Sequence, residues 1–384
     1  MRNPTLKAHE SELDAPDAAG KTSPAIFANG AALIGVLLFG IAATGFNPRT
    51  LDAPEDADIV TGEWATRYQS AYEDGLLIRE PSVHFWALLR YAVFREGRPG
   101  VLIGENGWLF TDEEFAHHPG AADQIAHWLE YVTAVRDRLA EQDVGLVVAL
   151  VPAKARIYPD RLGRYRFPDY AVPRYDEFRS RLVERGVPVP DLAAALSAVR
   201  PDADGFLRTD THWTPEGALA AARALREDVV TALEASQAER RAFVREPGDT
   251  VRHEGDLLTF IPLGPFMNRF GPAPDTTVEF TTSAREEREV GLFDEISIPV
   301  TLVGTSYSAG ELWDFDGAVA STVDADVLNV ATEGEGPFVP MQTYLDSDTL
   351  ERSPPAVVIW EIPERYLPVE YPPTPARALD AARE

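Results

Sequence analysis

The chain has 384 residues, of which 45% are hydrophobic and 10% aromatic, a composition that suits an ordinary globular core. Its formal net charge of −27 argues against nucleic acid as a partner, because phosphate groups would be repelled. The absence of cysteine excludes disulfide bonds and thiolate metal sites, and only Lys7, Lys21 and Lys154 among the 35 basic residues are lysines.

The N-terminal stretch has the features of a membrane anchor. Residues 1–24 are polar and of mixed charge, which predicts a disordered leader. Residues 25–46 carry no charge, and as a helix they would extend about 33 Å, enough to cross a bilayer core of about 30 Å. More basic residues precede this segment than follow it, so we expect a cytoplasmic leader and an external body. A cleaved signal peptide is the alternative, but the apolar run is long for one.

Helical and extended patterns then alternate along the chain. Residues 47–99 begin as an acidic linker and continue as a helical lead-in. Asn106-Gly107 between two apolar runs predicts a hairpin over residues 101–110. Farther on we expect helices over residues 123–141, 175–185, 192–199 and 217–235, and extended segments over residues 145–151, 187–189, 296–303, 324–329 and 357–360. This alternation favours an αβα arrangement around a mostly parallel sheet.

Two basic residues follow the first buried strand. In a parallel sheet, ligands bind at the carboxyl ends of the strands, and Lys154 and Arg156 fall at such an end. They are expected either to meet substrate hydroxyls or carboxylates, or to belong to an ordinary solvated loop, and the sequence does not favour one of these interpretations.

An acid and an imidazole stand two residues apart in Asp210-Thr-His212. In an extended segment, residues i and i+2 point the same way, so both side chains can enter one cleft. Thr214 then has the character of an N-cap and Pro215 that of a first helical residue. The pair is therefore predicted on a short loop at a helix start.

A serine follows the strand expected over residues 296–303, in the context Gly304-Thr-Ser306. A serine hydroxyl needs an imidazole to take its proton, and the imidazole needs a carboxylate to fix its tautomer. Asp210, His212 and Ser306 supply these three groups, and we predict that they converge in the fold.

Two other interpretations fit the sequence less well. The α/β-hydrolase elbow, Gly-x-Ser-x-Gly with the order Ser, Asp, His, does not match, because position 308 is serine and the acid and histidine come first. A metal site built from Asp210, His212, His253 and Asp256 has acceptable ligand types, but its spacing matches no common zinc pattern. We therefore expect no metal and no cofactor.

Six short motifs occur in a characteristic order. They are Gly107-Trp-Leu-Phe110, Val151-Pro-Ala-Lys154, Asp210-Thr-His212-Trp213-Thr-Pro215, Gly255-Asp-Leu257, Gly304-Thr-Ser306-Tyr307-Ser308 and Trp360-Glu361-Ile-Pro-Glu-Arg365. Together they resemble the AlgJ/AlgX-type polysaccharide O-acetyltransferases, an SGNH-hydrolase-like family. The resemblance covers residues 100–368, followed by a tail over residues 369–384. AlgX-type members carry a further C-terminal β-domain, for which this sequence ends too early, so it is more similar to the AlgJ type.

The resemblance implies a fold and a set of roles. The fold is a flavodoxin-like αβα sandwich with a circularly permuted SGNH motif order. Ser306 would be the nucleophile, His212 the base and Asp210 its orienting partner. Gly334 and Gly336 fall where such enzymes keep an oxyanion-facing glycine. No asparagine follows the strand over residues 357–360, so Arg365 is an alternative oxyanion donor. Trp213 and Tyr307, which flank the reactive residues, are further candidates for substrate contact.

The resemblance also implies an activity, partners and a location. The chain would be an inner-membrane protein with its catalytic domain in the periplasm, acetylating an alginate-like exopolysaccharide. A membrane-bound O-acyltransferase would donate the acetyl group, within a polysaccharide export complex. Two alternatives stay open, namely an acetyl-esterase that gives the group to water and a non-catalytic polysaccharide-binding scaffold.

Overall fold

The computed structural model describes residues 58–75, 79–200, 202–286 and 298–370, with a few helical positions between residues 30 and 42. The chain separates into two compact units, residues 1–85 and 86–384. The expected leader, most of the expected anchor over residues 25–46, and the tail beyond residue 370 lie outside the described residues. Within the described ranges, no helix combines the length and apolar character that crossing a membrane requires.

The predicted helical lead-in is present. It comprises α2 (Glu63–Gly75), α3 (Arg79–Leu89) and a π-helical turn, η2 (Arg90–Phe94). Along α2, the rings of Trp64, Tyr68 and Tyr72 stack in sequence, with centroids 5.1 and 6.3 Å apart. This i, i+4 spacing places the three rings on one side of the helix.

The predicted hairpin is confirmed. Strands β1 (Val101–Ile103) and β2 (Leu109–Thr111) pair antiparallel. In the connecting turn, Asn106 has φ of 56° and Gly107 φ of 80°, left-handed values that asparagine and glycine adopt at low cost.

Four parallel strands form the central sheet, in the order β3-β8-β6-β7. They are β3 (Gly145–Val151), β6 (Val300–Val303), β7 (Val327–Asn329) and β8 (Val357–Pro363), which confirms the four longer segments expected as strands. The piece over residues 187–189 forms no strand. The Pro188 carbonyl accepts one hydrogen bond from Val148 N at 2.9 Å, but prolines at positions 188 and 190 have no N–H to continue a ladder.

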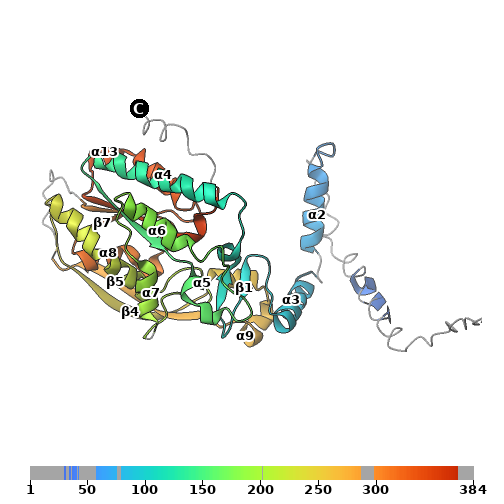
Figure 1. The fold of residues 1–384 in the computed structure, drawn as a ribbon. Helices are drawn as coiled ribbons and strands as arrows, with labels where there is room; N and C mark the ends of the chain where they lie inside the picture. Colours follow the sequence, from blue (N-terminus) through green and yellow to red (C-terminus); the bar gives the residue numbers. More distant parts are fainter. Residues whose placement is uncertain are drawn as a thin grey trace, which may run out of the picture. The chain divides into compact units, whose positions relative to one another are not determined.

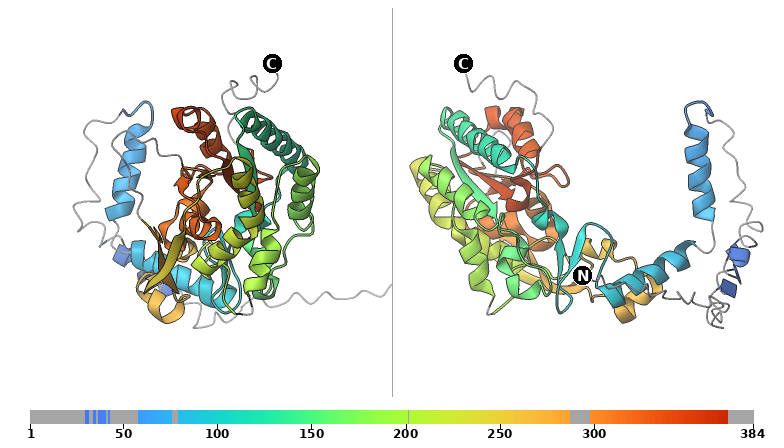
Figure 2. Two further views of the ribbon diagram at one scale, coloured as in Figure 1. Left: turned by 90° about the vertical axis from the view of Figure 1, so that its left-hand side faces the viewer. Right: turned by 45° about the vertical axis from the view of Figure 1, so that its right-hand side comes forward.

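Helices cover both faces of this sheet (Figures 1 and 2). Val147 and Ala149 of β3 face one hydrophobic cluster, and Val148 and Leu150 face another. The first cluster includes α7 (Leu192–Val199), α8 (Pro215–Ala235) and α11 (Phe315–Val323). The second includes α4 (Ala121–Ala140), α6 (Arg174–Glu184), α12 (Phe338–Leu345) and α13 (Asp348–Arg352). The predicted αβα sandwich is therefore confirmed.

A long antiparallel ribbon, which sequence analysis did not predict, packs against α11. It consists of β4 (Phe243–His253) and β5 (Asp275–Ala284), with a register shift between Pro247 and Thr250. The sequence Pro-Gly-Asp at positions 247–249 has the composition of a turn, and apart from Asp275 and Thr277 the residues of the ribbon are exposed or only partly buried. These two properties hide the period-2 pattern of a strand. Short helical turns complete the fold, namely η3 (Asp112–Phe115), α5 (Lys154–Ile157), η4 (Pro159–Arg161), η5 (Asp256–Phe260), η6 (Gly264–Phe266), α9 (Met267–Phe270), α10 (Ser306–Ala309), η7 (Glu311–Trp313) and η8 (Glu364–Tyr366).

Two adjacent positions of α6 test the layered packing. Leu182 is buried in the second cluster, whereas Val183 is 50% exposed. Because a cavity forms only at the buried position, Leu182→Ala should lower the free energy of unfolding by about 2–5 kcal/mol. Val183→Ala is the matched control and should change it by less than about 0.5 kcal/mol. Urea unfolding measures both, and equal losses would contradict the described orientation of α6.

Candidate active site

The loop before α8 holds the acid and the histidine. Residues 206 and 213 pair as an isolated bridge, and the Leu207 amide donates to the His212 carbonyl at 3.0 Å. The Thr214 hydroxyl accepts from Gly217 N at 3.0 Å, and Pro215 is the first helical residue, as the sequence predicts. Backbone pairing on one side and a helix cap on the other therefore fix the direction of the His212 side chain.

The serine stands on the turn after β6. Strand β6 ends at Val303, and Ser306 begins the short helix α10. A Cβ atom at position 304 would lie 2.5 Å from the Glu361 Oε2 atom, so only glycine fits at this position of the turn. Thr305 caps α10 by accepting from Tyr307 N at 3.3 Å.

The three predicted groups are in hydrogen-bond contact. His212 Nε2 lies 2.7 Å from Ser306 Oγ, across 94 residues of sequence. His212 Nδ1 lies 2.6 Å from Asp210 Oδ1. The three groups are close enough for a proton to pass between them. Their arrangement is that of a serine nucleophile, a histidine base and a carboxylate that orients the base. Asp210 and His212 are 3% and 8% exposed, so the contacts are largely shielded from water.

The second oxygen of Asp210 is also occupied. Asp210 Oδ2 lies 2.7 Å from His253 Nε2 and accepts from the Asp256 amide at 3.0 Å. Burial opposes ionisation of Asp210, but hydrogen bonds from His212 and His253 outweigh it and hold the pKa of the carboxyl well below its usual range. The same contact raises the pKa of His253. Asp210 is therefore an anion between two imidazoles.

The ligand atoms of the alternative metal site are near one another. Atoms of Asp210, His212 and Asp256 lie within 4.8 Å, and His253 also contacts Asp210. Each atom already has a protein partner, however, since Asp256 Oδ1 and Oδ2 accept from the amide and hydroxyl of Thr211 at 2.9 and 2.6 Å. The hydrogen-bond network accounts for these groups, and the expectation of a metal-free site stays a prediction.

Beneath the nucleophile turn lies a buried carboxyl, Glu361 of β8. Glu361 Oε2 accepts from Thr305 N at 2.7 Å and from the Ser308 hydroxyl at 3.2 Å, and the Thr305 hydroxyl also bonds it. Burial raises the pKa of Glu361 to about 7, although these hydrogen bonds act in the opposite direction. The carboxyl ties the residues on both sides of Ser306 to the central strand.

An aromatic wall surrounds the imidazole. The Trp313 ring stacks on His212, with centroids 4.5 Å apart and an interplanar angle of 15°, and the Tyr307 ring lies at 4.8 Å. Trp213 packs behind them and donates its indole N–H to the Tyr307 carbonyl at 3.1 Å. These contacts restrict rotation of the His212 ring.

Comparison with known proteins gives a consistent picture. A family model described as "SGNH hydrolase-like domain, acetyltransferase AlgX" matches residues 101–364. The chain belongs to this family. A Pseudomonas putida protein named probable alginate O-acetylase AlgJ is 40% identical over 319 residues, covering 82% of this chain and 83% of that protein. A protein of the same name from Azotobacter vinelandii is 38% identical over 320 residues, covering 83% and 82%.

Solved structures of the family agree with the fold. The O-acetyltransferase domain of Pseudomonas putida AlgJ matches with a TM-score of 0.66 and 39% identity, covering 74% of this chain and 99% of that chain. Pseudomonas aeruginosa AlgX matches with a TM-score of 0.55 and 21% identity, covering 70% and 63%, a likeness of fold alone. The family resemblance expected from the six motifs is confirmed.

Lys154 requires a correction. It is neither at a substrate surface nor in a solvated loop, because it is 1% exposed. Its ammonium group donates to the carbonyls of Leu109, Arg208 and Asp210 at 2.7, 3.0 and 2.9 Å. Burial lowers the pKa of Lys154 to about 8, against the attraction of nearby carboxylates. Lys154 therefore fixes the backbone of the loop that carries Asp210 and His212.

Arg156 also has a structural position. Its guanidinium bonds Glu364 at 2.6 and 3.0 Å and the carbonyls of Ala171 and Val172 at 2.9 Å. Only 15% of the Arg156 side chain is exposed, so little of its surface remains for contact with a substrate. The expected substrate contact is therefore replaced by a link between Glu364 of η8 and the segment before α6.

The remaining candidates divide in two. Trp213 and Tyr307 are 0% and 2% exposed, and the Tyr307 hydroxyl donates to the Thr211 carbonyl at 2.5 Å, so both support the site instead of contacting substrate.

The other candidates are the predicted oxyanion donors. Gly334 and Gly336 have φ of 78° and 68°. Their loop is joined to the nucleophile turn by a hydrogen bond from the Thr332 amide to the Gly304 carbonyl at 3.1 Å. Arg365 is buried near Tyr307, with its guanidinium 5.5 Å from that ring. The oxyanion role of these last three residues stays a prediction.

Sequence reasoning missed three contributors. His253 was considered only as a metal ligand, Glu361 only as the place of a missing asparagine, and Trp313 not at all. For Glu361 a signal was available, because a carboxylate inside the apolar run Val-Val-Ile-Trp-Glu-Ile needs a partner when it is buried.

Glu361→Gln tests the buried carboxyl. Because its pKa rises from the usual 4.5 to about 7 on folding, between these values the folded state binds a proton that the unfolded state lacks. The wild type therefore loses stability through this group as pH rises across that window, whereas the glutamine variant does not. The free energy of unfolding of the variant, relative to wild type, should increase from about pH 4.5 to about pH 7 and then level off. Urea titrations measure it, with exposed Glu351→Gln as control, and a pH-independent difference would contradict the described burial.

Proposed function

We propose that this chain is an O-acetyltransferase that acetylates hydroxyls of an acidic, alginate-like exopolysaccharide through an acyl-enzyme. The observation that carries the proposal is the contact of Ser306 Oγ with His212 Nε2 at 2.7 Å, in a chain that belongs to the SGNH hydrolase-like acetyltransferase family. The names of the relatives, probable alginate O-acetylase AlgJ, support the acceptor class. An acidic acceptor is compatible with the net charge of −27 only where arginines gather locally.

In the first half-reaction, Ser306 Oγ attacks the carbonyl carbon of an acetyl donor. His212 Nε2 accepts the hydroxyl proton as the new C–O bond forms, and Asp210 stabilises the imidazolium through Nδ1. When the tetrahedral intermediate collapses, the bond between the acetyl carbon and the leaving atom of the donor breaks, and His212 gives the proton to that leaving atom. An acetyl ester remains on Ser306.

In the second half-reaction, a sugar hydroxyl replaces the donor. His212 takes the proton of that hydroxyl, its oxygen attacks the serine ester, and Ser306 Oγ leaves with the proton from His212. The negative charge of both tetrahedral intermediates needs donors near Ser306. The Ser306 amide, a glycine amide of the Gly334/Gly336 loop, and Arg365 are the proposed donors.

The location and the donor are also proposed here. The uncharged segment 25–46 would anchor the chain in the inner membrane, with the catalytic domain in the periplasm. Acetyl-CoA is made and held in the cytoplasm, so an acetyl group must cross the membrane before Ser306 can use it. A membrane-bound O-acyltransferase within a polysaccharide export complex would provide that group.

Substitution of the triad tests the mechanism. Ser306→Ala and His212→Ala should each lower acetyl transfer by about 10⁴-fold or more, because removing either stops proton transfer at the nucleophile. Asp210→Ala should cost less, since Asp210 orients His212 and does not react. Turnover of a small acetyl ester and transfer to alginate oligosaccharide are both measured, with exposed Ser353→Ala as control.

The rival interpretations give different results in the same assays. Release of acetate at a rate that acceptor oligosaccharide leaves unchanged would favour an esterase. Unaltered polymer acetylation in cells carrying Ser306→Ala would favour a non-catalytic scaffold. Loss of activity to a chelator, restored by Zn²⁺ or Mn²⁺, would favour metal chemistry at Asp210, His212 and Asp256.

Release from the membrane tests the partnership. Replacing residues 1–46 with a cleavable signal sequence should reduce polymer acetylation in cells, because tethering raises the effective concentration of donor and acceptor sites for each other. Turnover of a small soluble ester by the purified domain should stay unchanged. Full acetylation by the released domain would oppose the tether, and full acetylation without any membrane O-acyltransferase would oppose this donor.

A further inference from the structure

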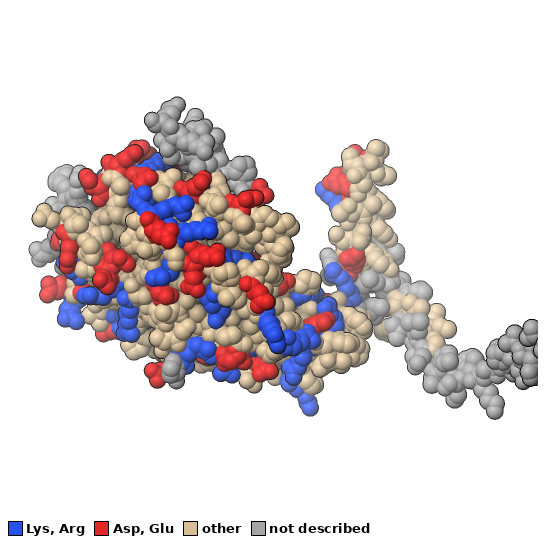
Figure 3. All heavy atoms as spheres, in the orientation of Figure 1, with Lys and Arg blue, Asp and Glu red and all other residues tan. Residues whose placement is uncertain are grey.

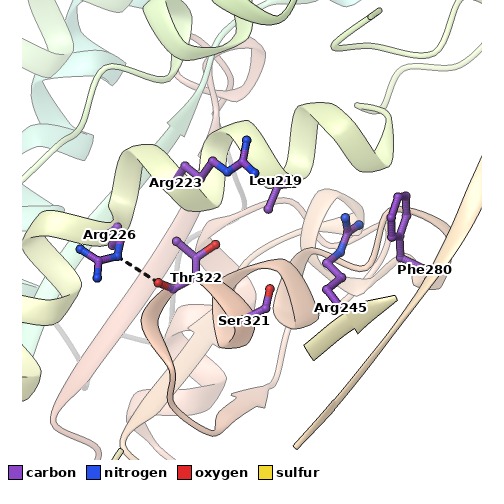
Figure 4. A pocket seen from close by; sticks show the side chains of 7 residues that line it. All are labelled: Leu219, Arg223, Arg226, Arg245, Phe280, Ser321 and Thr322. Carbon is purple, nitrogen blue, oxygen red and sulfur yellow. Dashed lines mark hydrogen bonds between the residues drawn. The ribbon is translucent and has the colours of Figure 1, made fainter. Parts of the chain in front are cut away.

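A cavity whose lining includes none of Asp210, His212 and Ser306 lies between α8, α11 and the β4–β5 ribbon. Its volume is about 410 Å³, which is within the range of small-ligand sites. Three arginines line it, Arg223 and Arg226 from α8 and Arg245 from β4, with Phe280 of β5 and Thr322 of α11. Figure 4 shows Arg245 extending toward α8 beside the Phe280 ring. No step of the proposed acetyl transfer uses this cavity.

Arg245 is the unusual member of the set. Only 6% of its side chain is exposed, and its guanidinium lies 3.8 Å from the Phe280 ring centroid. Its Nε donates to Asp314 Oδ2 at 2.9 Å, but the buried Nη2 has no hydrogen-bond partner within the described part of the chain. A buried charged donor without a partner is costly, so this atom is available for a ligand acceptor.

The charges around the cavity favour an anion. Asp314 and Glu216 are the acidic groups that act on Arg245, and Arg223 is the opposing cation. The Asp314 oxygen that bonds Arg245 also accepts from the Thr282 hydroxyl at 2.8 Å. Arg226 uses its Nε to bond the Thr322 carbonyl at 3.2 Å, while both α8 arginines are exposed. On the face of the second unit that Figure 3 shows, acidic and basic side chains intermingle. Among the described residues, the lining of the cavity includes three arginines and no acidic side chain.

The cavity is connected to the active site through two consecutive residues. Asp314, the partner of Arg245, directly follows Trp313, and the Trp313 ring stacks on His212. Adjacent residues of one segment thus contact the base of the active site and an arginine of the cavity. A guanidinium fork matches a carboxylate in shape and charge, and each uronate unit of an acidic polysaccharide carries one carboxylate.

We propose that the cavity lined by Arg223, Arg226 and Arg245 is a subsite that binds the carboxylate of a uronate unit, distant from the unit that is acetylated. The inference rests on the proposed function for the acceptor class. The subsite holds the polymer by its charge, and Ser306 acts on a hydroxyl farther along the same chain.

Binding in a catalytically silent background tests the subsite separately from the chemistry. The protein carries Ser306→Ala throughout, and its affinity is measured by calorimetry for an alginate oligosaccharide and for the same oligosaccharide with its carboxyl groups reduced to alcohols. Arg245→Gln should weaken binding of the acidic oligosaccharide by about 10-fold or more, the effect of one charge-assisted hydrogen bond. The reduced oligosaccharide should bind weakly to both proteins. Arg352→Ala is the control. Arg352 is exposed on α13, which packs on the other face of the central sheet, and loss of its positive charge should leave the affinity unchanged.

A double variant covers the case in which Arg245→Gln does not fold. Arg223 and Arg226 are exposed, so Arg223→Ala/Arg226→Ala should fold and should weaken acidic binding by about 3-fold or more. Wild-type affinity in the folded variants, or equal binding of acidic and reduced oligosaccharides, would overturn the proposal. Displacement by inorganic phosphate at concentrations where acetate has no effect would also overturn it, in favour of a phosphate site. A different result separates the two proposals. If binding depends on the arginines but the protein with Ser306 intact transfers no acetyl group, the proposed function is wrong and the carboxylate subsite is not.

Discussion

The carboxylate of Asp210 is the point on which the rest of the site depends. It accepts hydrogen bonds from the ring and the amide of His212, and from the amide of Asp256, and it contacts His253. A buried anion needs such partners, because burial alone would neutralise it. Once it is satisfied, only one tautomer of His212 keeps its Nδ1 proton on Asp210, and Nε2 is then directed at Ser306. The direction of proton transfer therefore follows from the hydrogen bonds that the protein donates to one carboxylate.

The sheet explains why residues so far apart in sequence meet. All four strands are parallel, so their carboxyl ends lie along one edge, and the segments after β3, β6 and β8 all reach it. Ser306 follows the central strand β6, and Glu361 stands in the neighbouring β8 to hold the turn in place. The loop that carries Asp210 and His212 belongs to none of these strands. It is attached to this edge through Lys154, which follows β3 and donates to the carbonyls of Arg208 and Asp210 at 3.0 and 2.9 Å. On its other side, Asp275 of the β4–β5 ribbon accepts from Thr209 N at 2.8 Å.

How much of this could be predicted from the sequence varied with the kind of signal. The buried strands and long helices have strong periodicity, and the order of six motifs identified the family, so the convergence of Ser306 and His212 was accessible. The β4–β5 ribbon was not, because its exposed residues and its Pro-Gly-Asp interruption mask the strand pattern. The structural role of Lys154 could not be predicted from the sequence either. A lysine that donates to three backbone carbonyls has no sequence signature, since carbonyls belong to every residue.

The burial of Lys154 has a practical consequence for handling this protein. Reagents that couple to lysine need an accessible amine, and this one is enclosed and bonded to three carbonyls. The other lysines of the sequence, Lys7 and Lys21, both precede the uncharged segment 25–46. Lysine-directed dyes, cross-linkers or sensor surfaces would therefore leave the folded catalytic unit without label on its lysine side chains, and attachment there requires a lysine introduced by design.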